Sequence, residues 1–131
     1  MNNVIAYLLN YAFQHEFDYI IMNDAPSIWP SVACPQRNLM FINLNWENKT
    51  EIPFQLAHEI GHMLEGNTCY MYNDFYRIKI QSENQADLHA IDLLRQYCLD
   101  NDISFESSII FAQQFGIPSH LYEIVQYRWY A

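Results

Sequence analysis

The pentapeptide His58-Glu59-Ile60-Gly61-His62 constrains this chain more than any other stretch. Residues four apart lie one above the other on an α-helix, so His58 and His62 can turn both imidazoles toward one point. Neutral imidazole is a common zinc ligand, so the spacing predicts a metal site with two ligands already in place. Glu59 lies beside them, where its carboxylate can reach a water on the metal and act as general base. This pattern is typical of metal-dependent peptidases.

The residues around the motif indicate a buried helix. Apolar side chains fill the positions such a helix needs, which leaves the two histidines and Glu59 as polar exceptions. Ionisable groups in an apolar helix are costly unless something pairs with them, and this favours a metal. The alternative is a pair of core histidines bonded to backbone carbonyls. The apolar flanking residues are Leu56, Ala57, Ile60, Met63 and Leu64.

The ends of the motif helix also have sequence signals. Thr50 is the expected N-cap, and Glu51 would complement the helix dipole. Pro53 is tolerated in the first turn, where backbone donors are unpaired. Gly66 is the expected C-terminal stop.

Length and composition predict one domain over residues 1–131. Half of the chain is apolar (51%) and the net charge is −9, so the composition is that of a folded protein. Only six Lys and Arg are present, too few for an extended phosphate-binding surface, so we expect no direct nucleic-acid contact.

The three cysteines, Cys34, Cys69 and Cys98, are widely spaced and odd in number. This usage suits a reducing compartment better than a disulfide framework. The N-terminus has no cationic region, and no apolar run approaches membrane-spanning length. We therefore expect a cytoplasmic protein that makes no membrane contact.

Before the motif, the pattern predicts a helix over residues 3–15 and β-strands at 18–22 and 38–44. His15 should face solvent at the helix end. Residues 26–37 contain three prolines and are expected to be irregular. The strands would form a small two- or three-stranded sheet, antiparallel in pairing, one edge of which could accept an extended peptide.

After the motif, residues 67–79 are expected to be a long connection. A helix should follow from residue 81 or 82 to Cys98, because small and apolar residues fall on one stripe. A final pair of helices is expected near 105–115 and 119–129. The stripe consists of Ala86, Ala90, Ile91, Leu94 and Cys98.

A catalytic zinc site needs a third protein ligand. Glu65 lies about 10 Å along the helix axis from His58, too far for one ion to meet both histidines and Glu65. Cys69 and Asp74 are weaker candidates. Glu83 is the preferred one, because it should begin a separate helix and the small Ala86 would let the two helices approach. Asp87, one turn later, could accept a hydrogen bond from a ligand histidine.

Two blocks of this sequence resemble the ImmA/IrrE family of metallo-endopeptidases. They are residues 56–64, Leu-Ala-His-Glu-Ile-Gly-His-Met-Leu, and residues 83–87, Glu-Asn-Gln-Ala-Asp. Residues 41–43, residues 115–118 and Arg128 also look like family features, so the resemblance covers about 38–128. One departure is His89-Ala90, where the family has an aromatic-small pair. A histidine there could orient a ligand or stabilise the oxyanion, although a polar helix face is the simpler interpretation.

The resemblance implies a compact zincin-like α+β domain. His58, His62 and Glu83 would be ligands of zinc, with manganese as the alternative metal, and Glu59 would be the catalytic base. It also implies a regulatory substrate, a helix-turn-helix repressor. The other hypotheses are a non-catalytic module that titrates a repressor around a structural metal, and a hydrolase of non-peptide amides or esters.

Overall fold

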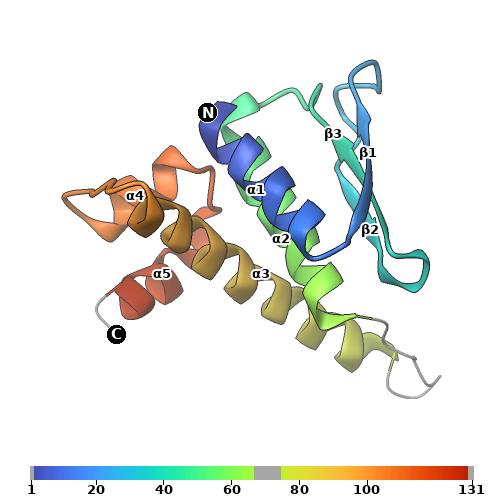
Figure 1. Cartoon of the computed structure of the whole chain (residues 1–131). Coiled ribbons are helices and arrows are strands. Elements are labelled where there is room, and N and C mark those ends of the chain that lie inside the picture. Colours follow the sequence, from blue (N-terminus) through green and yellow to red (C-terminus); the bar gives the residue numbers. More distant parts are fainter. Residues whose placement is uncertain (1, 67–74, 130–131) are drawn as a thin grey trace.

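The computed structural model describes residues 2–66 and 75–129, arranged as in Figure 1. Over these residues the fold is α+β and mostly helical, with one small sheet, as predicted. The helices and strands follow in the order α1 (Asn2–Gln14), β1 (Asp18–Met22), β2 (Val32–Cys34), β3 (Leu39–Asn43), α2 (Ile52–Glu65), α3 (Phe75–Asp100), α4 (Ser108–Gln114) and α5 (Tyr122–Trp129).

The three-stranded sheet has the order β1-β3-β2, so β3 is central and β2 forms an edge. β1 pairs with β3 in parallel, with Asp18 opposite Leu39 and Met22 opposite Asn43. The strands predicted at 18–22 and 38–44 are therefore confirmed, but their predicted antiparallel pairing is wrong. The reason is that the chain between β1 and β3 contains β2, which is the antiparallel partner of β3. β1 therefore pairs with the opposite edge of β3.

That partner is β2, which lies in the segment 26–37 that was expected to be irregular. It spans only three residues between Pro30 and Pro35, too few to show an alternating pattern. A 3-10 turn at Pro35–Arg37 leads back to β3 through Asn38. Asn38 has φ 51°, a left-handed conformation that asparagine tolerates better than most residues.

The sheet packs against the helices on one side (Figure 1). Met40 and Ile42 of β3 are fully buried, whereas Ile20 of β1 is 48% exposed. The predicted first helix is confirmed as α1, which buries Val4, Leu8 and Ala12 at a spacing of four residues. His15 is exposed just beyond the end of α1, as expected, and its ring stacks on Tyr11.

The crossing of α2 and α3 is the contact that builds the site. Its closest approach is at Gly61, where a Cβ atom would lie 2.8 Å from the carbonyl oxygen of Ala86 and 2.9 Å from its Cα. Two small residues therefore let the helix backbones nearly touch, as was expected of Ala86. The predicted stripe on α3 is buried along its whole length, from Ala86 to Cys98.

Helix α3 is longer than predicted at both ends, because it begins at Phe75 and ends at Asp100. Residues 75–79 of the expected connection are thus helical, and Glu83 lies in the third turn rather than at the start. The added turns cost little once a helix exists, because each further residue adds a backbone hydrogen bond. The rest of that connection, residues 67–74, lies outside the described residues.

The N-terminus of α2 differs from the prediction. Thr50 is not its cap, because Lys49–Glu51 form a 3-10 turn whose cap is Asn48, bonded to the Thr50 backbone N–H. Glu51 accepts a hydrogen bond from the indole of Trp46 at 2.9 Å. The C-terminus is as predicted: Gly66, at φ 77°, donates its N–H to the carbonyls of His62 and Met63.

The final helical pair is confirmed with shorter bounds, and it packs against the rest of the helical layer. Ser107 caps α4 by accepting from the Ile110 N–H. Gly116, at φ 72°, sits where a Cβ would be 2.2 Å from the Thr50 carbonyl oxygen, so the α4–α5 connection lies directly on the start of α2. Arg128 of α5 pairs with Asp92 of α3. Among the described helices, none is long and apolar enough to cross a membrane.

Candidate metal centre

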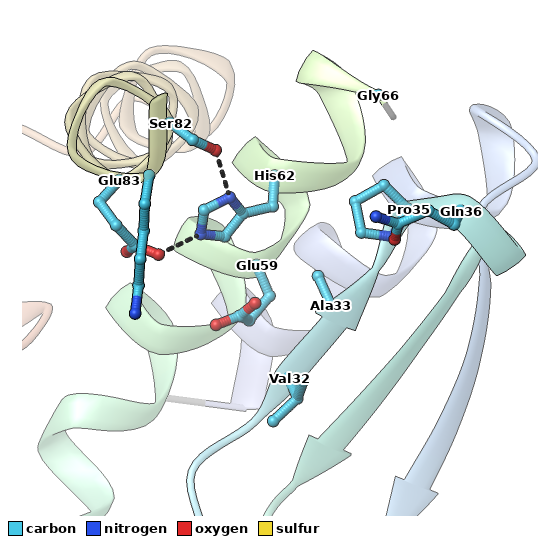
Figure 2. A pocket seen from close by; sticks show the side chains of 10 residues that line it. Val32, Ala33, Pro35, Gln36, Glu59, His62, Gly66, Ser82 and Glu83 are labelled. Atoms are coloured by element: carbon cyan, nitrogen blue, oxygen red, sulfur yellow. Dashed lines mark hydrogen bonds and ion pairs between the residues drawn. The ribbon is translucent and has the colours of Figure 1, made fainter. Parts of the chain in front are cut away.

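The structure brings His58, His62 and Glu83 together. The two histidines come from successive turns of α2, and their rings lie edge to face with centroids 4.8 Å apart. Glu83 comes from α3, which the Gly61–Ala86 contact places across them. One oxygen of Glu83 is 2.9 Å from His58 Nε2, and the other is 3.2 Å from His62 Nε2. Figure 2 shows Glu83 facing the His62 ring from the neighbouring helix.

These distances fit a tetrahedral metal. Zinc–nitrogen and zinc–oxygen bonds of about 2.0–2.2 Å place adjacent tetrahedral ligands about 3.3 Å apart. The two observed nitrogen–oxygen distances, each to a different oxygen of Glu83, are within a few tenths of an ångström of that value. With one ligand atom taken from each residue, the three atoms lie within 4.8 Å of one another, which is wider than a bound tetrahedral ion requires. His58, His62 and Glu83 are therefore a group that could hold a metal ion once the side chains move closer together. Two imidazoles and one carboxylate match the ligand preference of zinc better than that of manganese, because manganese prefers more oxygen ligands.

The outward nitrogen of His58 is held by Asp87. Its Nδ1 lies 2.8 Å from Asp87 Oδ1, and since a carboxylate only accepts, His58 donates the Nδ1–H. This leaves Nε2 as the nitrogen that faces Glu83. The predicted pairing of Asp87 with a motif histidine is thus present, and it fixes the ring orientation that a metal ligand needs.

The outward nitrogen of His62 contacts a residue that the sequence reasoning missed. Ser82 Oγ lies 3.3 Å from His62 Nδ1 and donates to Glu65 Oε2 at 3.2 Å. Ser82 directly precedes Glu83, and Glu65 follows His62 by three residues, so both are close in sequence to predicted ligands. No sequence signal predicts this contact, because a serine near the expected start of a helix is ordinarily interpreted as its N-cap.

The charges around the two imidazoles favour a cation. Three carboxylates, Glu59, Glu83 and Asp87, surround rings that are neutral when they act as ligands. Burial tends to lower the pKa of His58, but the Asp87 hydrogen bond and the nearby carboxylate charges outweigh it and raise that pKa. Burial lowers the pKa of His62, so this ring favours its neutral form. A divalent ion would compensate the acidic groups and leave both rings neutral.

Glu59 lies beside this group but is not part of it. Its carboxylate projects between Glu83 and strand β2 (Figure 2). Burial raises the pKa of Glu59 to about 7, helped by the charge of Glu83 and opposed by His58 and the Ala33 backbone N–H. A buried carboxyl with a pKa close to neutrality has the proton affinity that a general base needs.

Two cavities flank Glu59, which lines both. The first has a volume of about 320 Å³ and includes Val32 and Ala33 of β2 together with His62 and Glu83. The second, about 280 Å³, includes His58 and Asp87 together with Phe54 and Trp46. Glu59 therefore borders both cavities, whereas His62 lines the first and His58 the second.

The other sequence candidates do not add to this group among the described residues. Cys69 and Asp74 lie outside the described residues. His89 packs on Gly61, and neither it nor His120 is among the described residues that line the two cavities. Tyrosine is also missing from that described lining. Lys79 is its one basic residue, on the side of the first cavity.

A comparison of the chain with protein-family models, with curated proteins and with solved structures found no match.

Proposed function

We propose that this protein is a zinc-dependent endopeptidase. The observation that carries the proposal is the convergence of His58, His62 and Glu83 on one point, with the Glu59 carboxyl beside them. When bound, a zinc ion acidifies water and polarises a substrate carbonyl. Glu59 would take the proton of the attacking water and pass it to the leaving amine. Asp87 would hold His58 in the tautomer that presents Nε2 inward.

The free edge of β2 supports a peptide as substrate. β2 pairs only with β3 in the described sheet, so its other edge is free of a strand partner, and its residues Val32 and Ala33 border the first cavity. On this edge the Ala33 backbone N–H is hydrogen-bonded to Glu59, which places the base directly beside the strand. An extended peptide that added to this edge would run past Glu59 and the histidines.

The resemblance to the ImmA/IrrE family in residues 56–64 and 83–87 supports a regulatory protein as the substrate, with a helix-turn-helix repressor as the partner. The net charge of −9 is compatible with a basic DNA-binding target. The rival function is a binding module that titrates the repressor without cleaving it, since an ion that joins α2 to α3 could also serve only to brace the two helices.

Glu59→Gln separates these functions. The amide cannot take a proton, but Glu59 is not among the three ligands, so zinc content and helicity should stay near those of the parent. Where a neighbouring gene encodes a repressor, cleavage of that repressor, followed by mass spectrometry, should fall by at least about 100-fold, the lower range for loss of a general base. Glu123→Gln, the same change at an exposed residue of α5, is the control and should cleave normally.

The repressor's activity gives the decisive comparison. If Glu59→Gln relieves repression as well as the parent does, the peptidase proposal is wrong and the binding module is right. If the parent cleaves only small esters or amides and leaves the repressor intact, the substrate class is wrong.

A further inference from the structure

The two histidines of the site are braced in different ways. His58 donates directly to a carboxylate, Asp87, at 2.8 Å. His62 meets a neutral hydroxyl, Ser82 Oγ, at 3.3 Å, and the carboxylate Glu65 lies behind that hydroxyl at 3.2 Å. Glu65, which is too far along α2 to be a ligand, is therefore connected to the site through Ser82.

The hydroxyl has one proton, and this decides the direction of both hydrogen bonds. An ionised carboxylate can only accept, so Ser82 must donate its proton to Glu65. Ser82 Oγ can then only accept from His62, which requires the proton of the imidazole to be on Nδ1. The lone pair of His62 is thereby left on Nε2, the nitrogen that lies 3.2 Å from Glu83.

The helices α2 and α3 hold His62, Ser82 and Glu65 in fixed positions relative to one another. His62 and Glu65 are three residues apart on α2, so they lie on one face of the helix. Ser82 precedes Glu83 on α3, so one turn of α3 supplies both the acid that faces Nε2 and the hydroxyl that faces Nδ1 (Figure 2). His62, Ser82 and Glu65 are each partly buried, which limits competition from water.

We propose that Ser82 and Glu65 form a relay that positions His62 as a zinc ligand through Nε2. The proposal rests on the metal site of the preceding section, but not on peptidase activity. Ser82 and Glu65 are positioning residues, since neither would touch the metal. Ser82 and Glu65 would orient the His62 ring in the same way that Asp87 orients the His58 ring.

Zinc affinity gives the first test. Loss of a residue that hydrogen-bonds to a metal ligand typically weakens metal binding by 10- to 100-fold. Because both hydrogen bonds of Ser82 are long, we expect Ser82→Ala to bind zinc about 10-fold more weakly. Competition with a chromophoric chelator measures this affinity. Ser82→Thr keeps the hydroxyl and should restore most of the affinity. Glu65→Gln should give a smaller loss, because an amide can accept the proton but no longer fixes its direction. Gln85→Ala, at an exposed position of α3, is the control and should bind as the parent does.

Nuclear magnetic resonance of histidine-labelled, zinc-loaded protein gives a second test, one that a purely structural role of Ser82 would not affect. The parent should show slowly exchanging Nδ1–H protons on both His58 and His62. In Ser82→Ala the His62 Nδ1–H should exchange rapidly while the His58 Nδ1–H stays protected. Ser82→Thr should restore the slow exchange of the His62 proton.

Two results would overturn the relay alone: Ser82→Ala binding zinc as tightly as Gln85→Ala, or zinc-loaded parent in which His62 carries its proton on Nε2. A parent that takes up no zinc would overturn the metal site together with the relay. If Ser82→Ala fails to fold, as judged by circular dichroism, Glu65→Gln against Gln85→Ala decides by the same affinity and proton-exchange criteria.

Discussion

Asn43 shows how one buried polar side chain prepares the site from a distance. It is fully buried at the end of β3. Its amide donates to the carbonyls of Pro26 and Trp29, and its backbone N–H donates to Ser31 Oγ. Three points of the segment that leads into β2 are thus tied to the central strand, and this fixes the edge strand that borders Glu59.

Changing Asn43 to Asp should destabilise the fold while conserving the side-chain shape. The carboxylate cannot donate, so both carbonyls lose their partner and a buried negative charge faces them. Each buried group left unpaired costs about 1–3 kcal/mol, so the free energy of unfolding in urea should fall by about 2–4 kcal/mol. Asn45→Asp, where an exposed amide donates only to Ala25, should cost less than about 1 kcal/mol. Equal losses for the two variants would contradict this role of Asn43.

At the scale of elements, the site depends on how closely α2 and α3 cross. His58 and His62 lie on α2 and Glu83 on α3, and Gly61 is at the point of contact between the helices. Alanine is a better helix former than glycine by about 1 kcal/mol, which alone would favour Gly61→Ala. The added Cβ, however, would press on the Ala86 backbone at 2.8 Å, and backbone cannot rotate away.

We therefore expect Gly61→Ala to weaken zinc binding by at least about 10-fold, because α3 must move outward and carry Glu83 with it. The overpacking cost of about 1–3 kcal/mol is partly offset by helix propensity, so stability should change less than affinity. Chelator competition and urea unfolding measure the two. Gly116→Ala creates a clash on Thr50, away from this crossing, and should lower stability more than zinc affinity. The reverse order would show that the crossing does not position Glu83.

For the whole molecule, the proposed metal would join parts of the fold that are distant in sequence. His58 and Glu83 are 25 residues apart, and the chain between them includes the end of α2 and the beginning of α3. An ion held by both helices binds the folded state and not the unfolded chain, so it stabilises by mass action.

Zinc at 100 times its Kd should accordingly raise the free energy of unfolding by about 2.7 kcal/mol, seen as a higher Tm in calorimetry. Chelation should reverse the shift. Glu83→Ala should lose most of it, because only the two histidines of α2 remain. A parent that binds zinc with no change in Tm would show that the ion does not join α2 to α3.

The sequence by itself determined the elements whose signals are local. The spacing of His58 and His62, the apolar flanks, Gly66 and the stripe from Ala86 to Cys98 each depend on neighbours within one or two helical turns, and the structure agrees with all of them. Glu83 and Asp87 could be proposed because their helix had to pack on the motif helix through small residues.

Only the tertiary structure decided the rest. β2 is too short for a pattern, and its pairing, like the parallel alignment of β1 with β3, depends on which strands meet rather than on any strand alone. Ser82 and Glu65 meet across 17 residues, at a distance set by the crossing of two helices. Local sequence encodes which helix or strand forms and which face is apolar, whereas contacts between elements follow from how those faces fit together.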